Sequence, residues 1–166
     1  MFWTVVDSPI DPLLLVCDDT GLRGLSMQPH SPPAGARHDP EALADATRQL
    51  AEYFAGERLS FDLPLAPTGT PFQVKVWAAL REIPYGRTTS YGEIAIDLGQ
   101  PTAARAVGLA NGRNPLAVIV PCHRVIGRDG TLTGFGGGLD RKRWLLEHER
   151  TVLAQRSGEP VADGLW

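Results

Sequence analysis

The chain has 166 residues, which is enough for one ordinary domain or for two small domains packed together. Hydrophobic residues make up 43% and charged residues 21%, a balance that excludes a disordered chain and a membrane-spanning one. The net charge of -3 argues against a general polyanion binder, but residues 1–69 carry 4 basic against 10 acidic side chains, whereas residues 70–166 carry 12 against 9. Any nucleic-acid contact is therefore expected in the second half.

The first third of the chain predicts a small antiparallel sheet followed by a helix. β-Rich runs separated by turn signals predict strands over residues 2–7, 13–18 and 22–27. After a polar, proline-rich stretch, apolar residues at three- and four-residue steps predict a helix that begins at Asp39-Pro40 and ends near Gly56. Leu59 to Leu63 is predicted to return as a strand.

Residues 64–70 are predicted to be a linker between two domains. Residues 1–63 then form an N-terminal α/β support domain, and residues 71–166 a mostly helical C-terminal domain. The predicted fold class is α/β (α+β), with an antiparallel sheet in the first domain and helices in the second.

Three short helices are predicted directly beyond the linker, and a fourth from Asp140 to Arg150. The three run from residue 71, over residues 91–98 and from residue 101 to residue 112. Ser90 and Glu93 have the spacing of a capping box ahead of the second of them. The tight turn at Gly99 makes the second and third a helix-turn-helix, winged-helix-like candidate.

The third of these helices has an unusual surface for a helix that reads DNA. It is dominated by Ala and Gly and carries one long cation, Arg105, so the polar array needed to read base edges in the major groove is absent. Small residues allow close approach to a narrow groove, and Arg105 could fill the space of an extruded base. The alternative is that Ala103, Ala104 and Ala106 are simply helix formers and Arg105 is solvated.

Cys122 is the strongest candidate for chemistry. A β-branched run at residues 117–120, predicted as a strand, ends at Pro121-Cys122-His123-Arg124-Val125. A thiol attacks as thiolate and needs a base nearby, and His123 offers an imidazole. A third group must orient that imidazole, and the last predicted helix offers Glu147 and Glu149.

The other chemical signals are weaker. Free cysteine is usually a small buried hydrophobe, which is the better interpretation of Cys17. Two cysteines in all suit a reducing compartment, and the first residues lack the features of a signal peptide, so a cytoplasmic protein is expected. Cys17, His30 and His38 show no recognised ligand spacing, so no metal site and no cofactor are predicted.

The motif around Cys122 resembles the active-site signature of the O6-alkylguanine-DNA alkyltransferase family. Further segments occur in the family's order between residues 70 and 150: Ile83-Pro84-Tyr85-Gly86, Ser90-Tyr91-Gly92, Ala103 to Gly108, Asn114-Pro115, Gly136-Gly137-Gly138 and Trp144 to Glu149. Residues 1–63 resemble only the variable N-terminal domain of that family. The resemblance implies repair of O6-alkylguanine, and of O4-alkylthymine as a further substrate, by a single irreversible transfer of the alkyl group to Cys122.

The resemblance also implies a role for individual residues in that transfer. Cys122 is the nucleophile, His123 takes its proton through a water, and Glu149 supports the histidine. Asn114 braces the turn between the recognition helix and the active site. Tyr91 presses on the DNA phosphate and could donate a proton to the departing guanine.

The remaining implied roles concern DNA and the base pocket. Arg105 is the finger left in the duplex, and Ala103, Ala104 and Gly108 belong to the surface at the minor groove. Backbone groups at Cys122 and Val125 read the exocyclic amine of the base, and the loop with Phe135, Gly136 and Gly137 walls the pocket. Two positions depart from the family pattern: Phe135 lacks the aromatic hydroxyl expected there, and Gly136 stands where some members have a serine. Both departures affect the range of alkyl groups that the pocket accepts.

Two alternatives remain open from the sequence. One is a non-catalytic relative that only binds the lesion, against which Cys122 speaks; the other is a cysteine hydrolase built on Cys122 and His123. The expected partner is double-stranded DNA that contains O6-alkylguanine, bound by a monomer or by copies that cooperate along DNA, and no membrane is expected.

Overall fold

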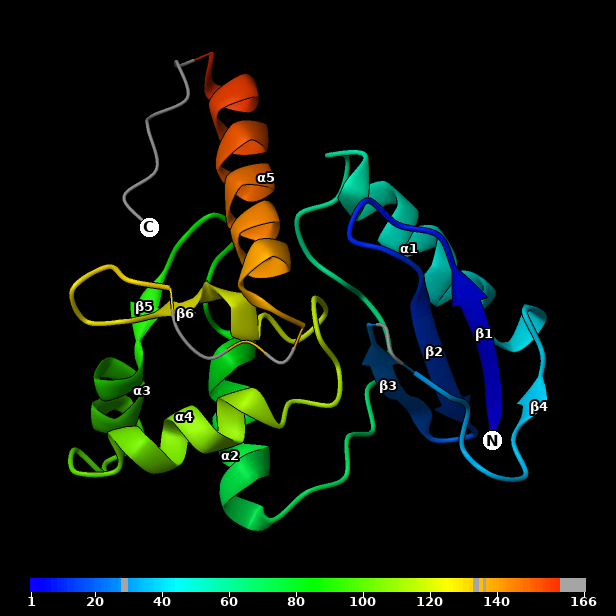
Figure 1. Ribbon diagram of the computed structural model, residues 1–166, viewed down its shortest axis with the longest axis horizontal. Coiled ribbons are helices and arrows are strands. Elements are labelled where there is room, and N and C mark those ends of the chain that lie inside the picture. Colours follow the sequence, from blue (N-terminus) through cyan, green and yellow to red (C-terminus); the bar gives the residue numbers. More distant parts are fainter. Residues whose placement is uncertain (28–29, 133–134, 136, 159–166) are drawn as a thin grey trace. The chain divides into compact units, whose positions relative to one another are not determined.

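The computed structural model describes residues 1–27, 30–132, 135 and 137–158 (Figure 1). The strands are β1 (Phe2–Val6), β2 (Leu13–Asp18), β3 (Gly21–Ser26), β4 (Arg37–His38), β5 (Thr89–Ser90) and β6 (Val125–Ile126). The helices are the 3₁₀ turns η1 (Glu41–Leu43) and η2 (Cys122–Arg124), together with α1 (Ala44–Phe54), α2 (Pro71–Arg81), α3 (Tyr91–Asp97), α4 (Ala104–Gly112) and α5 (Leu139–Ser157).

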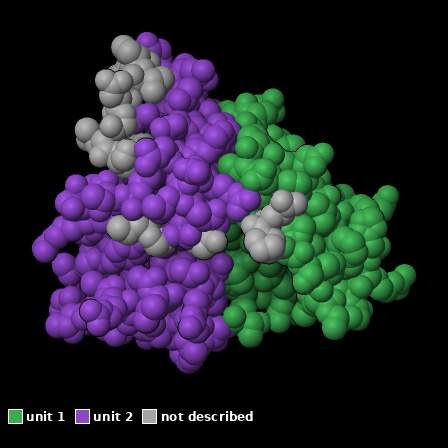
Figure 2. Space-filling view, in the orientation of Figure 1, with its two compact units in different colours: residues 1–68, 115–119 green, residues 69–114, 120–166 purple. Residues whose placement is uncertain are grey.

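The chain forms two compact units, coloured separately in Figure 2. Unit 1 comprises residues 1–68 and 115–119, and unit 2 the other described residues. The division after Thr68 falls inside the segment predicted as a linker. Residues 115–119 were predicted as part of the second domain, but they group with unit 1 because the Leu25 amide donates to the Pro115 carbonyl at 2.8 Å.

Unit 1 is built on a four-stranded sheet of order β3-β2-β1-β4. β2 is antiparallel to both neighbours, and five of its six residues are buried, as expected for a central strand. The predicted antiparallel sheet is confirmed for the first three strands. β4 lies in the stretch predicted to be irregular and pairs parallel to β1 over only two residues, so it has no periodic pattern to detect.

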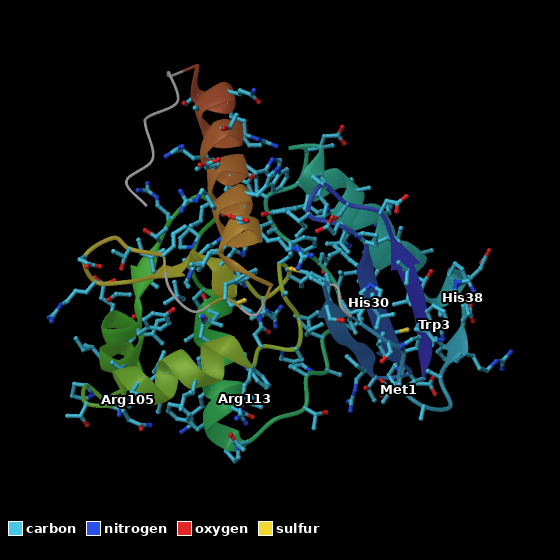
Figure 3. All side chains as sticks on the ribbon, viewed as in Figure 1. Met1, Trp3, His30, His38, Arg105 and Arg113 are labelled. Atoms are coloured by element: carbon cyan, nitrogen blue, oxygen red, sulfur yellow. The ribbon has the colours of Figure 1, made fainter. Side chains whose placement is uncertain are left out.

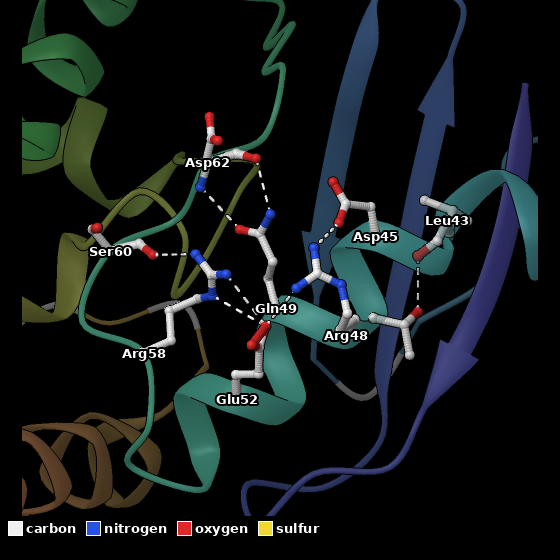
Figure 4. Close-up of polar contacts among 9 residues, drawn as sticks. Leu43, Asp45, Arg48, Gln49, Glu52, Arg58, Ser60 and Asp62 are labelled. Atoms are coloured by element: carbon white, nitrogen blue, oxygen red, sulfur yellow. Dashed lines mark hydrogen bonds and ion pairs between the residues drawn. The ribbon is translucent and has the colours of Figure 1, made fainter.

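The strand predicted over residues 59–63 is wrong. In a strand, its backbone amides and carbonyls would bond a neighbouring strand, but here a side chain bonds them instead. The buried Gln49 side chain on α1 donates to the Asp62 carbonyl at 2.9 Å and accepts from the Asp62 amide at 2.9 Å (Figure 4). The backbone meets the sheet only afterwards, where the Leu22 amide donates to the Pro64 carbonyl at 2.8 Å.

The strand predicted over residues 117–120 is also wrong. Val118 has a φ of 71°, which is rare for a β-branched residue, and the Ile119 amide donates to the Ala117 carbonyl at 2.9 Å across it. Leu116, Val118 and Val120 are buried nevertheless. The apolar run that suggested a strand is therefore a sequence of turns with buried side chains.

The first three predicted helices of unit 2 are confirmed with small changes at their ends. Thr70 and Gln73 form a reciprocal capping box on α2, and Ser90 and Glu93 form another on α3. α4 begins at Ala104 rather than at Pro101, because the Ala103 amide closes a turn onto the Gln100 carbonyl at 2.9 Å. Figure 1 shows α3 and α4 joined by this short turn, as a helix-turn-helix requires.

α5 is longer than predicted and has an unusual buried face. That face combines Lys142, Leu145, Leu146, Glu149 and Val152. Two charged residues seven positions apart therefore point into the interior of unit 2 together with aliphatic ones. Among the described helices, none has the length and apolar character that crossing a membrane requires.

Candidate active site

The Cys122 thiol lies in the interior of unit 2, at the start of η2. Pro121 has φ -80° and ψ 63°, and the Cys122 amide donates to the Val120 carbonyl at 2.8 Å, which is the geometry of an inverse γ-turn. The cysteine is only 5% exposed. β6 follows η2 and pairs parallel with β5, so the segment that carries the thiol is fixed at both ends.

His123 pairs with Glu149 of α5. Its Nε2 lies 2.7 Å from Glu149 Oε2, and both side chains are fully buried. The other ring nitrogen, Nδ1, is buried and has no hydrogen-bond partner among the described residues. Because an ionised Glu149 accepts the proton on Nε2, Nδ1 of the neutral imidazole is left with its lone pair.

Arg124 and a backbone amide complete the shell around Glu149. Arg124 Nε donates to Glu149 Oε1 at 2.8 Å and Nη2 donates to Oε2 at 3.0 Å, a bidentate pair. Arg124 Nη1 donates to the Ile83 carbonyl at 2.8 Å, and the Gly86 amide donates to Glu149 Oε1 at 3.1 Å. Together with His123 Nε2, these donors give the carboxylate four hydrogen bonds, which hold it in one orientation.

This shell sets the charge states of the pair. Burial alone would raise the pKa of Glu149, but His123 and Arg124 outweigh it and hold that pKa well below its usual range. Burial lowers the pKa of His123, against the opposing effect of Glu149. At neutral pH the site therefore contains an ionised Glu149 and a neutral imidazole that can accept a proton.

The thiol itself starts protonated. Burial raises the pKa of Cys122, while a hydrogen bond from Asn114 and the charge of Lys142 act in the opposite direction. Asn114 Nδ2 also donates to the Val120 carbonyl at 2.8 Å, so this side chain joins the end of α4 to the segment before the thiol. Ionisation of Cys122 thus requires both a proton acceptor and a nearby positive charge.

Lys142 supplies that charge from α5. The side chain is fully buried, and Nζ donates to the Val125 carbonyl at 2.5 Å. Burial lowers the pKa of Lys142 to about 8, against the opposing effect of Cys122. The ammonium and the thiol therefore influence each other's ionisation, each favouring the charged form of the other.

The structure brings together Cys122, His123, Glu149 and Asn114, four of the five residues predicted to be catalytic. The fifth, Tyr91, lies at the start of α3. It lines a hollow of about 640 Å³ together with Ser90, Ala104 and Arg128. A Cβ built on Gly108 would lie 3.7 Å from the Tyr91 ring, so Tyr91 and α4 share one surface.

The predicted DNA-binding and base-pocket residues are distributed over two places. Arg105 is exposed on α4, with Ala103, Ala104 and Gly108 partly exposed around it. Val125 follows η2, and Gly137 precedes α5, where its carbonyl accepts from Arg141 Nη1 at 3.0 Å. Phe135 is half-buried, and Gly136 lies outside the described residues.

Sequence reasoning missed Lys142 and gave Arg124 no role. The spacing of α5 contained the missing signal, because Lys142 stands three residues before Leu145 and seven before Glu149, on the same face as the leucines. That spacing also separates Glu149, which is buried, from Glu147, which is exposed. In the described part of the chain, no group of three or more His, Cys, Asp or Glu side chains is arranged to hold a metal ion.

Comparisons with known proteins match most of the chain, in two consecutive segments. A family model described as 6-O-methylguanine DNA methyltransferase, DNA binding domain, matches residues 71–151, and one described as the ribonuclease-like domain of the same proteins matches residues 1–67. The chain belongs to the 6-O-methylguanine DNA methyltransferase family.

Relatives within this family are similar over nearly their full length. The methylated-DNA–protein-cysteine methyltransferase of Methanosarcina acetivorans is 52% identical over 153 residues, which cover 90% of this chain and 98% of the relative. The protein of the same name from Mycolicibacterium paratuberculosis is 56% identical over 151 residues, 89% of this chain and 92% of the relative. A crystal structure of Mycobacterium tuberculosis OGT in complex with DNA superposes with a TM-score of 0.88 at 53% identity, covering 92% of this chain and 94% of that one.

Proposed function

We propose that this chain repairs DNA by moving an alkyl group from O6 of guanine onto Cys122, once per protein molecule. The observation that carries the proposal is the buried Cys122 thiol in the residue before His123, whose Nε2 lies 2.7 Å from Oε2 of the buried Glu149. Family membership supports the same reaction, and the relatives' names state a methylated-DNA substrate and a cysteine acceptor.

The transfer begins with removal of the thiol proton. His123 Nδ1 accepts it, either directly or through one water, and the imidazolium that forms is stabilised by Glu149. Cys122 Sγ then attacks the alkyl carbon, a C–S bond forms, and the bond from that carbon to guanine O6 breaks. The guanine anion that leaves takes up a proton, for which the Tyr91 hydroxyl is our candidate donor.

The product explains a single turnover. A thioether has no activated carbonyl that water could attack, unlike the thioester of a cysteine hydrolase. No group in the described site offers a route for removing the alkyl group, since His123, Asn114 and Lys142 act on protons and charge. Each molecule is therefore consumed by one repair event.

Lys142 is assigned a positioning and electrostatic role in this mechanism. Its ammonium stabilises the Cys122 thiolate as it forms, which offsets the cost of creating an anion in the interior. Its hydrogen bond to the Val125 carbonyl holds the backbone that we assign to reading the exocyclic amine of the base. One side chain is thus assigned both to stabilising the thiolate and to positioning the backbone that reads the base.

Delivery of the base is assigned to the surface of α3 and α4. The thiol is buried, so a guanine in the duplex must be extruded before its O6 atom comes near Sγ. Arg105 projects from α4 and is suited to fill the space left in the stack, while Ala103 and Ala104 permit close approach at the minor groove. Tyr91 is suited to contact the phosphate that moves with the base.

The test is to mix the protein with a duplex that contains one O6-methylguanine and to weigh the protein afterwards. We expect a gain of about 14 Da, one CH2, on the peptide that contains Cys122, and no gain for Cys122→Ser. The matched control is Cys17→Ser, which should react as the parent does. Binding without an adduct would instead identify a lesion-binding protein, and repeated turnover a hydrolase.

A further inference from the structure

The exposed face of α4 and the residue that caps its C-terminus, Arg113, carry two more long side chains besides Arg105. Four, seven and eight residues after it come Leu109, Gly112 and Arg113, which is the spacing of one helix face. We call these four residues the α4 ridge. The opposite face is buried, through Val107, Ala110 and Asn111.

Leu109 is the most exposed large hydrophobic side chain in the described part of the chain, at 65%. Gly112, one turn further along, has no side chain, and a Cβ built on it would meet nothing within 4 Å. The surface beside Leu109 is therefore not covered by a side chain at Gly112. A leucine in this position gains little from the fold of unit 2, because so much of it stays in water.

The two ends of the α4 ridge are positive. Arg105 and Arg113 lie at opposite ends of α4 (Figure 3), and neither forms an ion pair within the described residues. α4 contains no acidic residue. Eight residues of helix separate the two arginines by about 12 Å, roughly twice the width of the minor groove, so one can enter the groove while the other reaches the phosphates at its edge.

We propose that Leu109 and Arg113 extend the DNA contact of α4 beyond Arg105. Leu109 packs against the sugar walls of the minor groove, and Arg113 binds a phosphate on the strand that borders it. The inference rests on the proposed function for the direction in which α4 meets DNA. It adds two contacts to the duplex that keep the helix in the groove while Arg105 occupies the stack.

The chemistry of the α4 ridge favours DNA over a protein partner. One leucine between two cations offers far less apolar area than the roughly 800 Å² per partner of a stable protein interface. Apolar side chains flanked by basic ones are, in contrast, the usual equipment of proteins that bind the minor groove. With Arg105 in the stack, the positive charge of Arg113 at the other end of the α4 ridge matches a phosphate at the groove edge.

The experiment measures binding of undamaged duplex DNA by fluorescence anisotropy between about 50 and 200 mM salt. Leu109→Ala is expected to weaken binding roughly 5- to 10-fold at every salt concentration and to leave the slope of log K against log salt unchanged. Arg113→Ala is expected to reduce that slope by about 0.9, the value for one phosphate contact. The matched controls on unit 1 are Val5→Ala, an exposed apolar side chain, and Arg48→Ala, an exposed arginine on α1.

A second readout separates this inference from the proposed function. Alkyl transfer from free O6-benzylguanine needs the thiol but no duplex, so both ridge variants should lose much more in duplex binding than in this reaction. Binding by Leu109→Ala that equals binding by Val5→Ala, or an unchanged salt slope for Arg113→Ala, would overturn the inference. Failure of the parent protein to transfer any alkyl group would overturn the proposed function and leave the binding result intact.

Discussion

Arg124 and Arg105 have the same side chain in opposite surroundings. Arg124 is buried and makes three hydrogen bonds, two of them to Glu149. Arg105 is exposed and has no ion-pair partner among the described residues. A buried guanidinium must be fully bonded to be tolerated, whereas an exposed one costs little and stays available to a ligand.

The contrast separates the two tasks of the molecule. The buried network of Glu149, Arg124, His123 and Lys142, which we propose prepares the thiol for reaction, has little freedom to adapt. The exposed side chains of α4 are available to contact a ligand, and they contribute little to the packing of unit 2. Substitutions in the network should therefore change the stability of the protein and lower alkyl transfer from any substrate. Substitutions on α4 should lower only the repair of lesions in duplex DNA.

The largest effect is expected for Glu149→Gln. It leaves the Arg124 charge buried without its carboxylate, which costs about 3–5 kcal/mol of unfolding free energy. It also removes the anion that stabilises the His123 imidazolium, so transfer from free O6-benzylguanine should fall roughly 10²- to 10⁴-fold. Urea unfolding and a single-turnover assay measure the two losses.

A second variant covers the case in which Glu149→Gln does not fold. His123→Ala removes the base and leaves the Arg124–Glu149 pair in place, so it should remain folded and still lose transfer. Full transfer by folded His123→Ala would show that Cys122 is ionised by another route.

Lys142→Met is expected to raise the stability of the protein and to slow alkyl transfer. The folded pKa of Lys142 is about 8 against the ordinary 10.5, so between these pH values the unfolded chain binds the extra proton and stability rises with pH. At neutral pH the buried ammonium is therefore a cost, up to about 3 kcal/mol, that methionine removes. The thiolate loses its cation at the same time, so transfer near pH 7 should slow about 10-fold.

The measurement is the difference between the two proteins across pH. The parent should gain stability from pH 8 toward 10.5 relative to Lys142→Met, and the pH midpoint of Cys122 alkylation by iodoacetamide should lie higher in the variant. An unchanged midpoint in a folded Lys142→Met protein would remove the electrostatic role and leave only the hydrogen bond to Val125.

Arg105→Ala should produce a smaller and more selective loss. Repair of O6-methylguanine in a duplex should slow about 10- to 100-fold, because the extruded base loses the group that replaces it in the stack. Reaction with free O6-benzylguanine, which needs no extrusion, should slow much less. Equal losses on the two substrates would show that Arg105 supports the site rather than the opening of the duplex.

The smallest effect is expected for Thr70→Ala, which touches neither region. Thr70 caps α2 by accepting from the Gln73 amide at 3.1 Å, and loss of such a cap costs about 1 kcal/mol. Thermal unfolding should show this loss while both transfer assays stay at the parent's values. A change in either assay would mean that the position of α2 influences the site.

The sequence predicted the fold well where local signals and packing agree. Pro71 and the capping box of Ser90 and Glu93 predicted the starts of α2 and α3, and β-rich runs between turn signals predicted the first three strands. It failed where a distant partner decided the outcome. Asp62 pairs with a side chain on α1 instead of a strand, and Val118 adopts a positive φ that its β-branched side chain disfavours.

The site was predicted to a similar degree. Cys122, His123 and Glu149 were named from a motif and a resemblance, and the structure places His123 and Glu149 within 2.7 Å of each other. Lys142 was missed because a lysine in a predicted helix is normally solvated, and only its spacing from Leu145 and Glu149 shows that it is buried. Which charges a buried site collects depends on how several helices meet, and a linear pattern does not contain that information.

The most direct test of the account is the number of alkyl groups transferred when lesion-bearing duplex is in large excess. Peptide mass spectrometry should find one alkyl group per protein molecule, on Cys122, with no further transfer after that point. Continued transfer beyond one equivalent, or an alkyl group on a residue other than Cys122 in the folded protein, would contradict the account.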